Sequence, residues 1–433
     1  MNAGVIIIIL ALVLFAVLAF KKISPLIIAP IVSLFVIIFS GLDIWGTMSG
    51  AYMQSTADFV KSYFLMFLVG AILGAVYEET NAARSIANKI VEVTKGKWCA
   101  ALVMAITGIL TYGGISGFVV YFAMFPIALH LFKANKVSRI IMPAAISSGC
   151  WTWSMIAPGA PSVQNVIAMR CLGTTGTAAL IPGIVAAGLQ FIMVAFWLEY
   201  RSKYLKSKGF YFEDDRLPVL EIPDRDEKNL PNPLLAAIPI IAILAGFIFF
   251  KLQVEIAVTI GIILAVILLW NQIDGTKVDS WIKILSTGAS NSCTSVMLTA
   301  MVVGFGGVVK LTDGFADAVA ALQNLNMPPL VLVAIATAAC AGLTASATGG
   351  LGIAFDALKD TFVTLGVNLN YVHRISVIAA GTLDTLPHQG GLAILFNLCK
   401  VTHKEAYFDI FITQMMIPIL TLFVVIPMCA AGM

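Results

Sequence analysis

The chain has 433 residues, of which 60% are hydrophobic and only 11% are charged, and its mean hydropathy is +0.96. Its formal net charge is +3. This composition excludes a water-soluble globular protein and predicts an all-α polytopic membrane protein, because helices satisfy their own backbone hydrogen bonds in lipid. We therefore expect the lipid bilayer as its environment and expect no nucleic-acid partner.

Seven apolar runs approach or reach the roughly 20 residues that a helix needs to cross a bilayer. They are residues 3–20, 23–39, 63–76, 182–197, 233–250, 256–270 and 408–428. We interpret the first run as a membrane span and not as a cleaved signal peptide, because Lys21 and Lys22 follow it instead of preceding it.

A hydrophilic segment, residues 200–232, interrupts this pattern with seven basic and seven acidic side chains. We interpret it as a cytoplasmic linker between a first repeat, residues 1–199, and a second repeat, residues 233–433. Basic residues gather in the cytoplasmic loops of membrane proteins. We therefore predict that both termini lie outside the cell inner membrane. In this orientation 20 of the 26 Lys and Arg residues are cytoplasmic, provided that two apolar segments do not cross the membrane.

Those two segments, residues 98–132 and 328–365, each carry a Gly/Ser/Thr cluster near the middle and predict re-entrant hairpins. Each half of the chain then makes five crossings, so the halves enter the membrane from opposite sides and form inverted repeats. Arg139 and Arg374, which are 235 residues apart, occupy matching positions in such repeats. An ordinary pair of closely packed helices is the alternative for each hairpin.

A broken helix is expected after each hairpin, because prolines and polar residues interrupt residues 157–165 in the first half and 384–389 in the second. We expect a new half-helix to begin near Pro387, and its free N–H groups to attract an anion. Two further stretches, residues 79–93 and 278–290, mix charge with regular apolar positions and predict interfacial helices.

Paired breaks in the two halves of a chain are typical of the binding sites of secondary transporters. Glycine backbone, hydroxyl and amide groups at the hairpin tips and breaks suit a carboxylate or hydroxyl ligand, since together they donate and accept hydrogen bonds. The predicted substrate-binding residues are Gly114, Ser116, Ser162, Gln164, Asn165, Ser346, Thr348, Gly349 and Thr385.

Asp384 and His388 are the ionisable residues of the second break, and either could carry a coupling proton. The structural alternative is that Asp384 caps the following half-helix and His388 bonds a backbone carbonyl. Oxygens of the substrate-binding residues could instead coordinate Na⁺. No metal site and no organic cofactor are predicted, because the seven cysteines show no Cys-x-x-Cys spacing and no His-Glu-x-x-His motif occurs.

The sequence resembles the gluconate permease (GntP) family of proton-coupled organic-anion symporters over most of its length. The resemblance is densest at residues 113–120, 157–165, 343–354 and at Gly381-Thr-Leu-Asp-Thr-Leu-Pro-His388. It implies a scaffold domain, a transport domain of hairpins and broken helices, a homodimer and an elevator-type motion. It also implies import of gluconate-like sugar acids or of small hydroxy acids such as 3-hydroxybutyrate.

The sequence departs from typical gluconate transporters at residues 150–155, where Trp151 and Trp153 flank the first break. Bulky rings beside a pocket would favour a ligand smaller than gluconate, and simple packing is the alternative. A sodium-coupled carboxylate symporter and a passive anion channel are the rival functions. An enzyme is not expected, because no nucleophile with its base can be identified.

Overall fold

The computed structural model describes residues 3–220, 230–250, 252–273, 277–323, 327–364 and 366–433. Every regular element in this part of the chain is a helix, and the predicted all-α class is therefore confirmed. Most of the long helices are rich in apolar residues, whereas short helices such as residues 82–94 and 403–410 mix polar and apolar side chains.

The described helices of the two halves of the chain, which the sequence divides at residues 200–232, are as follows. The first half contains α1 (Ala3–Phe20), α2 (Pro25–Phe39), α3 (Ile44–Thr47), α4 (Met53–Glu79), α5 (Ala82–Thr94), α6 (Cys99–Tyr112), α7 (Gly117–Ala134), α8 (Met142–Trp151), α9 (Trp153–Ile156), α10 (Val163–Leu172) and α11 (Leu180–Ser207). The second half contains α12 (Pro233–Ile248), α13 (Val254–Leu268), α14 (Lys277–Lys310), α15 (Asp313–Gln323), α16 (Pro329–Thr344), α17 (Ala347–Thr364), α18 (Leu369–Leu383), α19 (Gly390–Cys399), α20 (His403–Ile410) and α21 (Ile417–Ala430). The two repeats, their inverted relation and their boundaries stay predictions.

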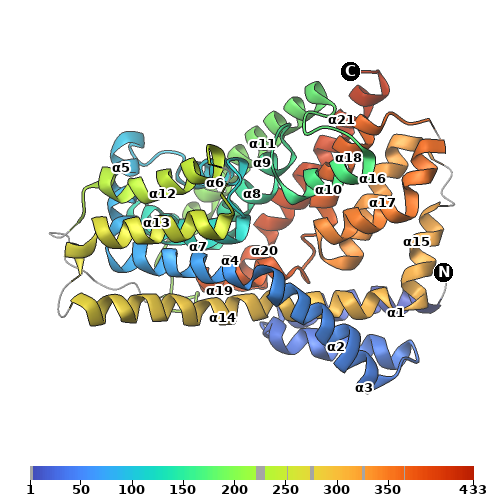
Figure 1. The fold of residues 1–433 in the computed structure, drawn as a ribbon, viewed down its shortest axis with the longest axis horizontal. Coiled ribbons are helices and arrows are strands. Elements are labelled where there is room, and N and C mark those ends of the chain that lie inside the picture. The colour runs from blue at the N-terminus through green and yellow to red at the C-terminus, as the bar shows by residue number, and fades with distance from the viewer. Residues whose placement is uncertain (1–2, 221–229, 251, 274–276, 324–326, 365) are drawn as a thin grey trace.

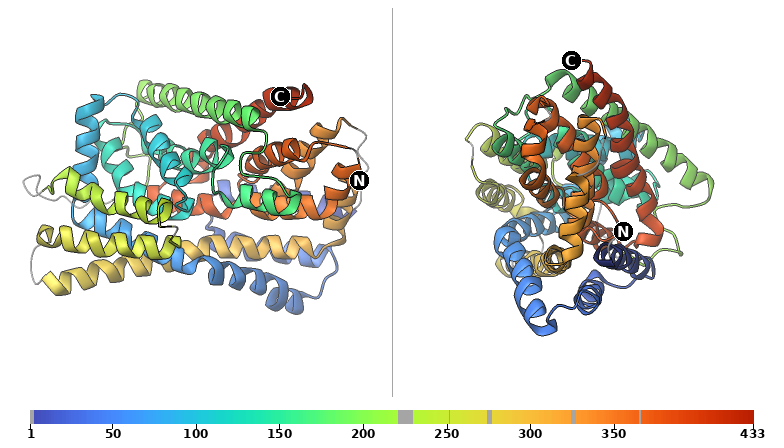
Figure 2. Two further views of the ribbon diagram at one scale, coloured as in Figure 1. Left: turned by 45° about the horizontal axis from the view of Figure 1, so that its top comes forward. Right: turned by 90° about the vertical axis from the view of Figure 1, so that its right-hand side faces the viewer.

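Two long helices, α4 and α14, run side by side along the length of the molecule (Figure 1). Their close approach depends on glycine, since a Cβ on Gly288 would lie 2.6 Å from the Cα of Ile72. Helices α5, α7, α12 and α13 lie toward one end of this pair, and α15 to α18 lie toward the other (Figures 1 and 2). The molecule therefore has two lobes joined by α4 and α14.

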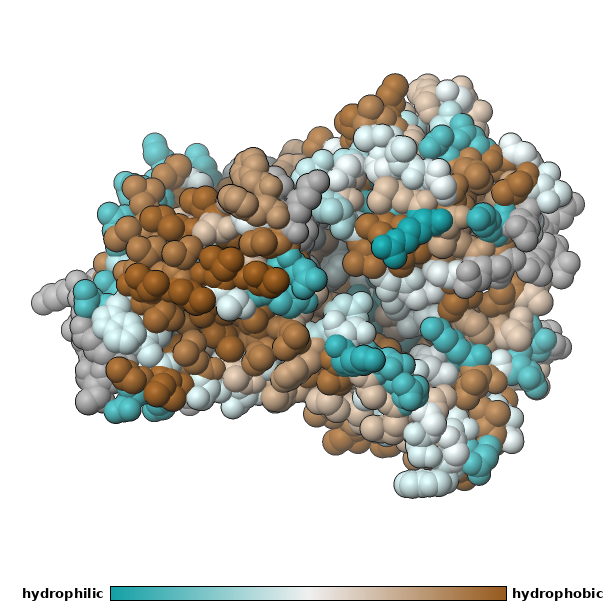
Figure 3. All heavy atoms as spheres, in the orientation of Figure 1, coloured by the Kyte–Doolittle hydropathy of each residue, from teal (hydrophilic) through white to brown (hydrophobic). Residues whose placement is uncertain are grey.

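The surface of the protein is apolar over wide areas. Six of the described helices are long and apolar enough to cross a membrane, or seven if α5 and α6, which are bent by 119°, form one span. Large hydrophobic side chains such as Ile267 and Phe196 are 63% exposed, and Figure 3 shows hydrophobic side chains covering the lobe that contains α12 and α13. Because soluble proteins rarely expose apolar patches of this extent, the protein is a multi-pass membrane protein.

Two sequence-based boundaries in the second half were wrong. Residues 278–290 are the first part of α14 and not a separate interfacial helix. The half-helix expected near Pro387 begins at Gly390, because a turn precedes it in which the Gln389 N–H donates to the Leu386 carbonyl at 2.8 Å.

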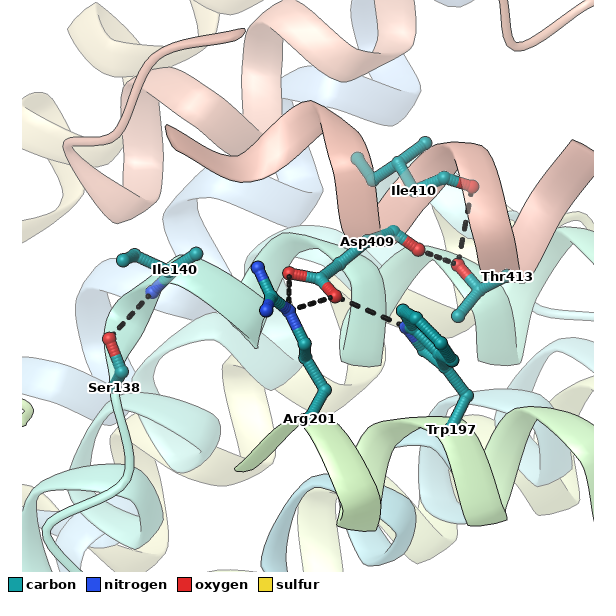
Figure 4. Close-up of polar contacts among 7 residues, drawn as sticks. All are labelled: Ser138, Ile140, Trp197, Arg201, Asp409, Ile410 and Thr413. Atoms are coloured by element: carbon teal, nitrogen blue, oxygen red, sulfur yellow. Dashed lines mark hydrogen bonds and ion pairs between the residues drawn. The ribbon is translucent and has the colours of Figure 1, made fainter. Parts of the chain in front are cut away.

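The predicted linker, residues 200–232, begins inside α11, which continues to Ser207. Figure 4 shows the contact that fixes this end of the helix: Arg201 Nε lies 2.9 Å from Asp409 Oδ1 on α20, and the Trp197 indole donates to the same oxygen at 3.1 Å. Asp409 is fully buried. The ion pair therefore holds α11 against α20. Residues 221–229 of the linker lie outside the described residues.

Candidate substrate site

A cavity of about 340 Å³ lies where both hairpin tips and both helix breaks meet α4 and α14. Aromatic and apolar side chains of the long helices form one wall of it. They are Phe59, Tyr63 and Met66 of α4 and Val302 and Val303 of α14. The face drawn in Figure 3 is hollowed between the two lobes. The other walls come from the predicted hairpin tips and breaks.

The first hairpin turns between α6 and α7 at the cavity. Gly114, with a φ of +103°, makes the turn, because this conformation is strained for residues with a Cβ. Ser116 is the N-cap of α7 but its hydroxyl makes no capping hydrogen bond. Gly114 and Ser116 both line the cavity, so the tip presents to a ligand its backbone and a hydroxyl that has no hydrogen-bond partner among the described residues.

The second hairpin turns between α16 and α17, and its tip also lines the cavity. Its arms touch backbone to backbone at Gly350, where a Cβ would clash with Ala341. Ser346 and Thr348 line the cavity, and their hydroxyl oxygens lie 3.0 Å apart. Gly349 does not line the cavity: its N–H donates to the Ser346 hydroxyl at 3.1 Å, so it orients this serine.

The first break separates α9 from α10. Ser162 caps α10 by accepting from the Asn165 N–H at 3.3 Å, and its hydroxyl donates to the Met155 carbonyl at 3.0 Å. Gln164 lines the cavity, and its side-chain amide makes no hydrogen bond within the described part of the chain. Gln164 is therefore the free hydrogen-bonding group of this break.

Asn165 lies behind the cavity wall and connects the two halves of the chain. Its amide nitrogen donates to the carbonyls of Met155 and Ala160, at 2.9 and 3.2 Å. Its amide oxygen accepts from His373 Nε2 at 3.0 Å and faces Arg374 at 3.4 Å. Since both ends of this amide are occupied, its role is to fix the break and not to contact a ligand.

Arg374 is the largest fully buried side chain of the protein's described part. Its guanidinium donates to the carbonyls of Ile156, Gly176 and Ala178, all in the first half of the chain. Arg139, which the predicted repeats would match to Arg374, donates to the carbonyls of Phe212, Pro218 and Cys399. Each arginine therefore ties the broken helix of its own repeat to backbone of the other half or of the linker.

The second break separates α18 from α19 and carries an acid. Asp384 lines the cavity, and its Oδ1 atom is buried without a hydrogen-bond partner among the described residues. The N-terminus of α19 has no side-chain cap, and Gly390 and Gly391 there line the cavity. This arrangement offers free backbone N–H groups beside an acidic side chain.

Thr385 and His388 face away from the cavity. The Thr385 hydroxyl donates to the Thr382 carbonyl at 2.8 Å. His388 Nε2 donates to the Gly342 carbonyl at 2.9 Å, and its ring packs edge-on against Phe15 and Phe305. His388 therefore fastens the second break to the second hairpin, which is the structural alternative considered for it.

The structure brings together at the cavity seven of the eleven predicted site residues. These are Gly114, Ser116, Ser162, Gln164, Ser346, Thr348 and Asp384. The other four, Asn165, Gly349, Thr385 and His388, lie outside its lining and hold the lining in place. No group of three or more His, Cys, Asp or Glu able to hold a metal ion occurs within the described residues.

Sequence reasoning missed the wall supplied by the long helices. Phe59, Tyr63 and Thr299 line the cavity from α4 and α14. In the sequence, each lies in an apolar or mixed stretch that no cluster of Gly or Pro residues marks as a break. Thr299 also bonds the second break, donating to the Gly390 carbonyl at 3.2 Å. Nothing local in the sequence distinguishes these positions from helix packing.

Comparison with known proteins identifies relatives. No protein-family model matches the chain. It is 25% identical over 346 residues to an uncharacterized transporter of Haemophilus influenzae, which covers 78% of this chain and 77% of the relative. Among solved structures, the YdaH transporter of Alcanivorax borkumensis has a TM-score of 0.48 and 13% identity, covering 90% of this chain and 88% of that one.

A second relative spans almost the whole chain. The uncharacterized transporter YxjC of Bacillus subtilis is 30% identical over 450 residues, and the match covers 94% of each protein. With this identity over nearly its full length, the chain belongs to the transporter family of YxjC.

Proposed function

We propose that the protein imports a small hydroxy monocarboxylate or sugar acid together with a proton. The observation that carries this proposal is the uncapped N-terminus of α19 in the cavity, directly after a break that carries Asp384. Free N–H groups at a helix N-terminus bind anions. An acid beside them can carry the proton that offsets the substrate charge.

The cavity chemistry fits such a ligand. Its volume of about 340 Å³ is near the lower end of the roughly 300 to 1,000 Å³ typical of small-molecule sites. A carboxylate at Gly390 and Gly391 leaves Gln164 and the hairpin-tip hydroxyls of Ser116 and Ser346 for hydroxyl groups of the substrate. The aromatic wall on α4 accommodates the carbon chain.

In the proposed cycle, the substrate and a proton bind between the hairpin tips and the breaks. Burying an isolated carboxylate is costly, so a proton on Asp384 stabilises the occluded state. The hairpins and broken helices then move as a transport domain against a scaffold that contains the apolar helices α1, α2, α12 and α13, in an elevator-type motion. We propose a homodimer, as the resemblance to the gluconate permease family implies, and we propose from the distribution of basic residues that it lies in the inner membrane with both termini outside.

Uptake of labelled 3-hydroxybutyrate and gluconate into proteoliposomes tests this function. We expect accumulation when a pH gradient alone is imposed. Accumulation only with a Na⁺ gradient would contradict proton coupling and move the coupling site to the hairpin oxygens near Ser346 and Thr348. Equilibration without accumulation under every gradient would contradict symport and favour a passive channel.

Replacing Gln164 by Leu should weaken substrate binding without harming the fold. The substitution keeps the side-chain size but removes the free amide of the first break. One lost hydrogen bond to a polar substrate raises KM by roughly tenfold, or about 1.4 kcal/mol. The matched control is Gln190→Leu, because Gln190 is a buried glutamine on α11 outside the cavity lining. Equal KM changes in both variants would contradict the assignment.

A further inference from the structure

We propose that Trp151, and not its neighbour Trp153, sets the upper size limit of the transported acid. This inference rests on the proposed function and names a specificity-determining residue for it. The two tryptophans stand on either side of Thr152, where the backbone leaves the helical conformation with φ −115° and ψ −110°. Because of this irregularity, the side chains of Trp151 and Trp153 point in different directions.

The two rings have different surroundings. Trp151 lines the cavity, whereas Trp153 does not. Trp153 donates from its indole nitrogen to Met104 Sδ at 3.1 Å and packs edge-on against Phe191 of α11, with ring centroids 5.3 Å apart. Trp153 is therefore a packing residue between α6 and α11, and Trp151 forms part of the wall that a ligand meets.

Three contacts from α7 hold the Trp151 ring in place. A Cβ on Gly117 would lie 2.5 Å from Trp151 Cζ2, so the ring lies directly on the backbone of the hairpin arm. The indole N–H donates to the hydroxyl of Tyr121, which is fully buried. Phe118 meets the ring edge-on at a centroid distance of 5.7 Å. A ring fixed on this side cannot yield to a longer ligand without displacing α7.

This rigid wall limits ligand size because the proposed carboxylate anchor of the site is also fixed. Gly390, at the N-terminus of α19, is held against α14, where a Cβ on Gly390 would lie 2.9 Å from the Thr299 Cα. If the carboxylate of an acid binds at the N-terminus of α19, the carbon chain of that acid must fit in the space left between Gly390 and the remaining walls of the cavity, which include Trp151. We therefore expect a four-carbon hydroxy acid to be accepted and a six-carbon polyhydroxy acid to be disfavoured by Trp151.

The test compares kcat/KM for labelled 3-hydroxybutyrate and gluconate in proteoliposomes containing the wild type, Trp151→Ala, Trp151→Phe or Trp153→Phe. We expect the two Trp151 variants to shift the gluconate to 3-hydroxybutyrate ratio toward gluconate, by at least about tenfold for Trp151→Ala, since one pocket methylene is already worth roughly 10-fold or more in discrimination. Trp153→Phe should leave the ratio unchanged. Tyr121→Phe, which removes the indole's acceptor outside the cavity lining, should shift it in the same direction by a smaller factor.

The outcomes separate the two proposals. If the wild type accumulates 3-hydroxybutyrate and the ratio is unchanged in the Trp151 variants, or shifts equally in Trp153→Phe, only the size-limit inference is overturned. If the wild type takes up neither acid, the proposed function is overturned and the inference with it. Should Trp151→Ala fail to fold, Trp151→Phe and Tyr121→Phe decide the question.

Discussion

Replacing Asp384 by Asn should abolish accumulation driven by a pH gradient, so that the internal to external substrate ratio falls to one, while exchange of substrate continues. Asn keeps the size of the side chain but cannot bind and release a proton at physiological pH. Asp384 lines the cavity and its Oδ1 atom has no partner among the described residues, so no ion pair is lost with the charge. The measurement is uptake and counterflow of the same labelled acid in proteoliposomes.

Two comparisons sharpen this experiment. Asp58→Asn changes an exposed carboxylate of α4, whose Oδ1 accepts from Gln54 at 2.9 Å, and should leave accumulation intact. His388→Gln removes the other predicted proton carrier; because His388 bonds Gly342 outside the cavity, we expect reduced stability with coupling retained. Undiminished uphill uptake by Asp384→Asn would remove this residue from the coupling mechanism.

Replacing Arg374 by Met should destabilise the protein more than any other single arginine change in the broken helices. The substitution keeps much of the apolar stem but leaves the buried carbonyls of Ile156 and Ala178 without their donor, whereas the Gly176 carbonyl keeps the Gly159 N–H. Each unsatisfied buried group costs about 1 to 3 kcal/mol, so we expect a loss of roughly 3 to 5 kcal/mol. The measurement is the thermal unfolding temperature in detergent, which we expect to be lower for Arg374→Met than for the wild type.

The control for this change is Arg170→Met. Arg170 lies on α10 in the same region, but it is exposed. It should have almost no effect, since exposed charges contribute little. Arg374→Lys should recover only part of the loss, because a lysine cannot reach several carbonyls in different directions with a planar fork. An unfolding temperature for Arg374→Met equal to that of Arg170→Met would contradict this role.

The sequence predicted the helical class and the positions of the hairpin tips well. Polar residues inside apolar runs are costly in lipid, so they mark places where the chain is buried in protein or lines a cavity. Gly114, Ser346 and Asp384 interrupt apolar runs, and all three line the cavity. The same reasoning could not tell a ligand-facing polar residue from one that supports it. Gln164 and Asn165 are adjacent and chemically alike, yet one faces the cavity and the other bonds Arg374 and two carbonyls.

The boundaries that were wrong have a common physical origin. A helix continues or ends according to tertiary partners that local sequence does not show. Helix α11 passes into the charged linker because Asp409, far along the chain, pairs with Arg201. Residues 278–290 look interfacial by charge but belong to a 34-residue helix that packs on α4 along its length.

The packing of α10 and α19 on helices of the other half of the chain has a consequence for biogenesis. Helix α10 from the first repeat packs on α17 and α18, and α19 from the second packs on α7 and α8. During synthesis the first half therefore reaches the membrane with the carbonyls of Ile156, Gly176 and Ala178 still lacking the guanidinium of Arg374, which has yet to be translated. The packing around the first break therefore becomes complete only after α18, which carries Arg374, has been translated.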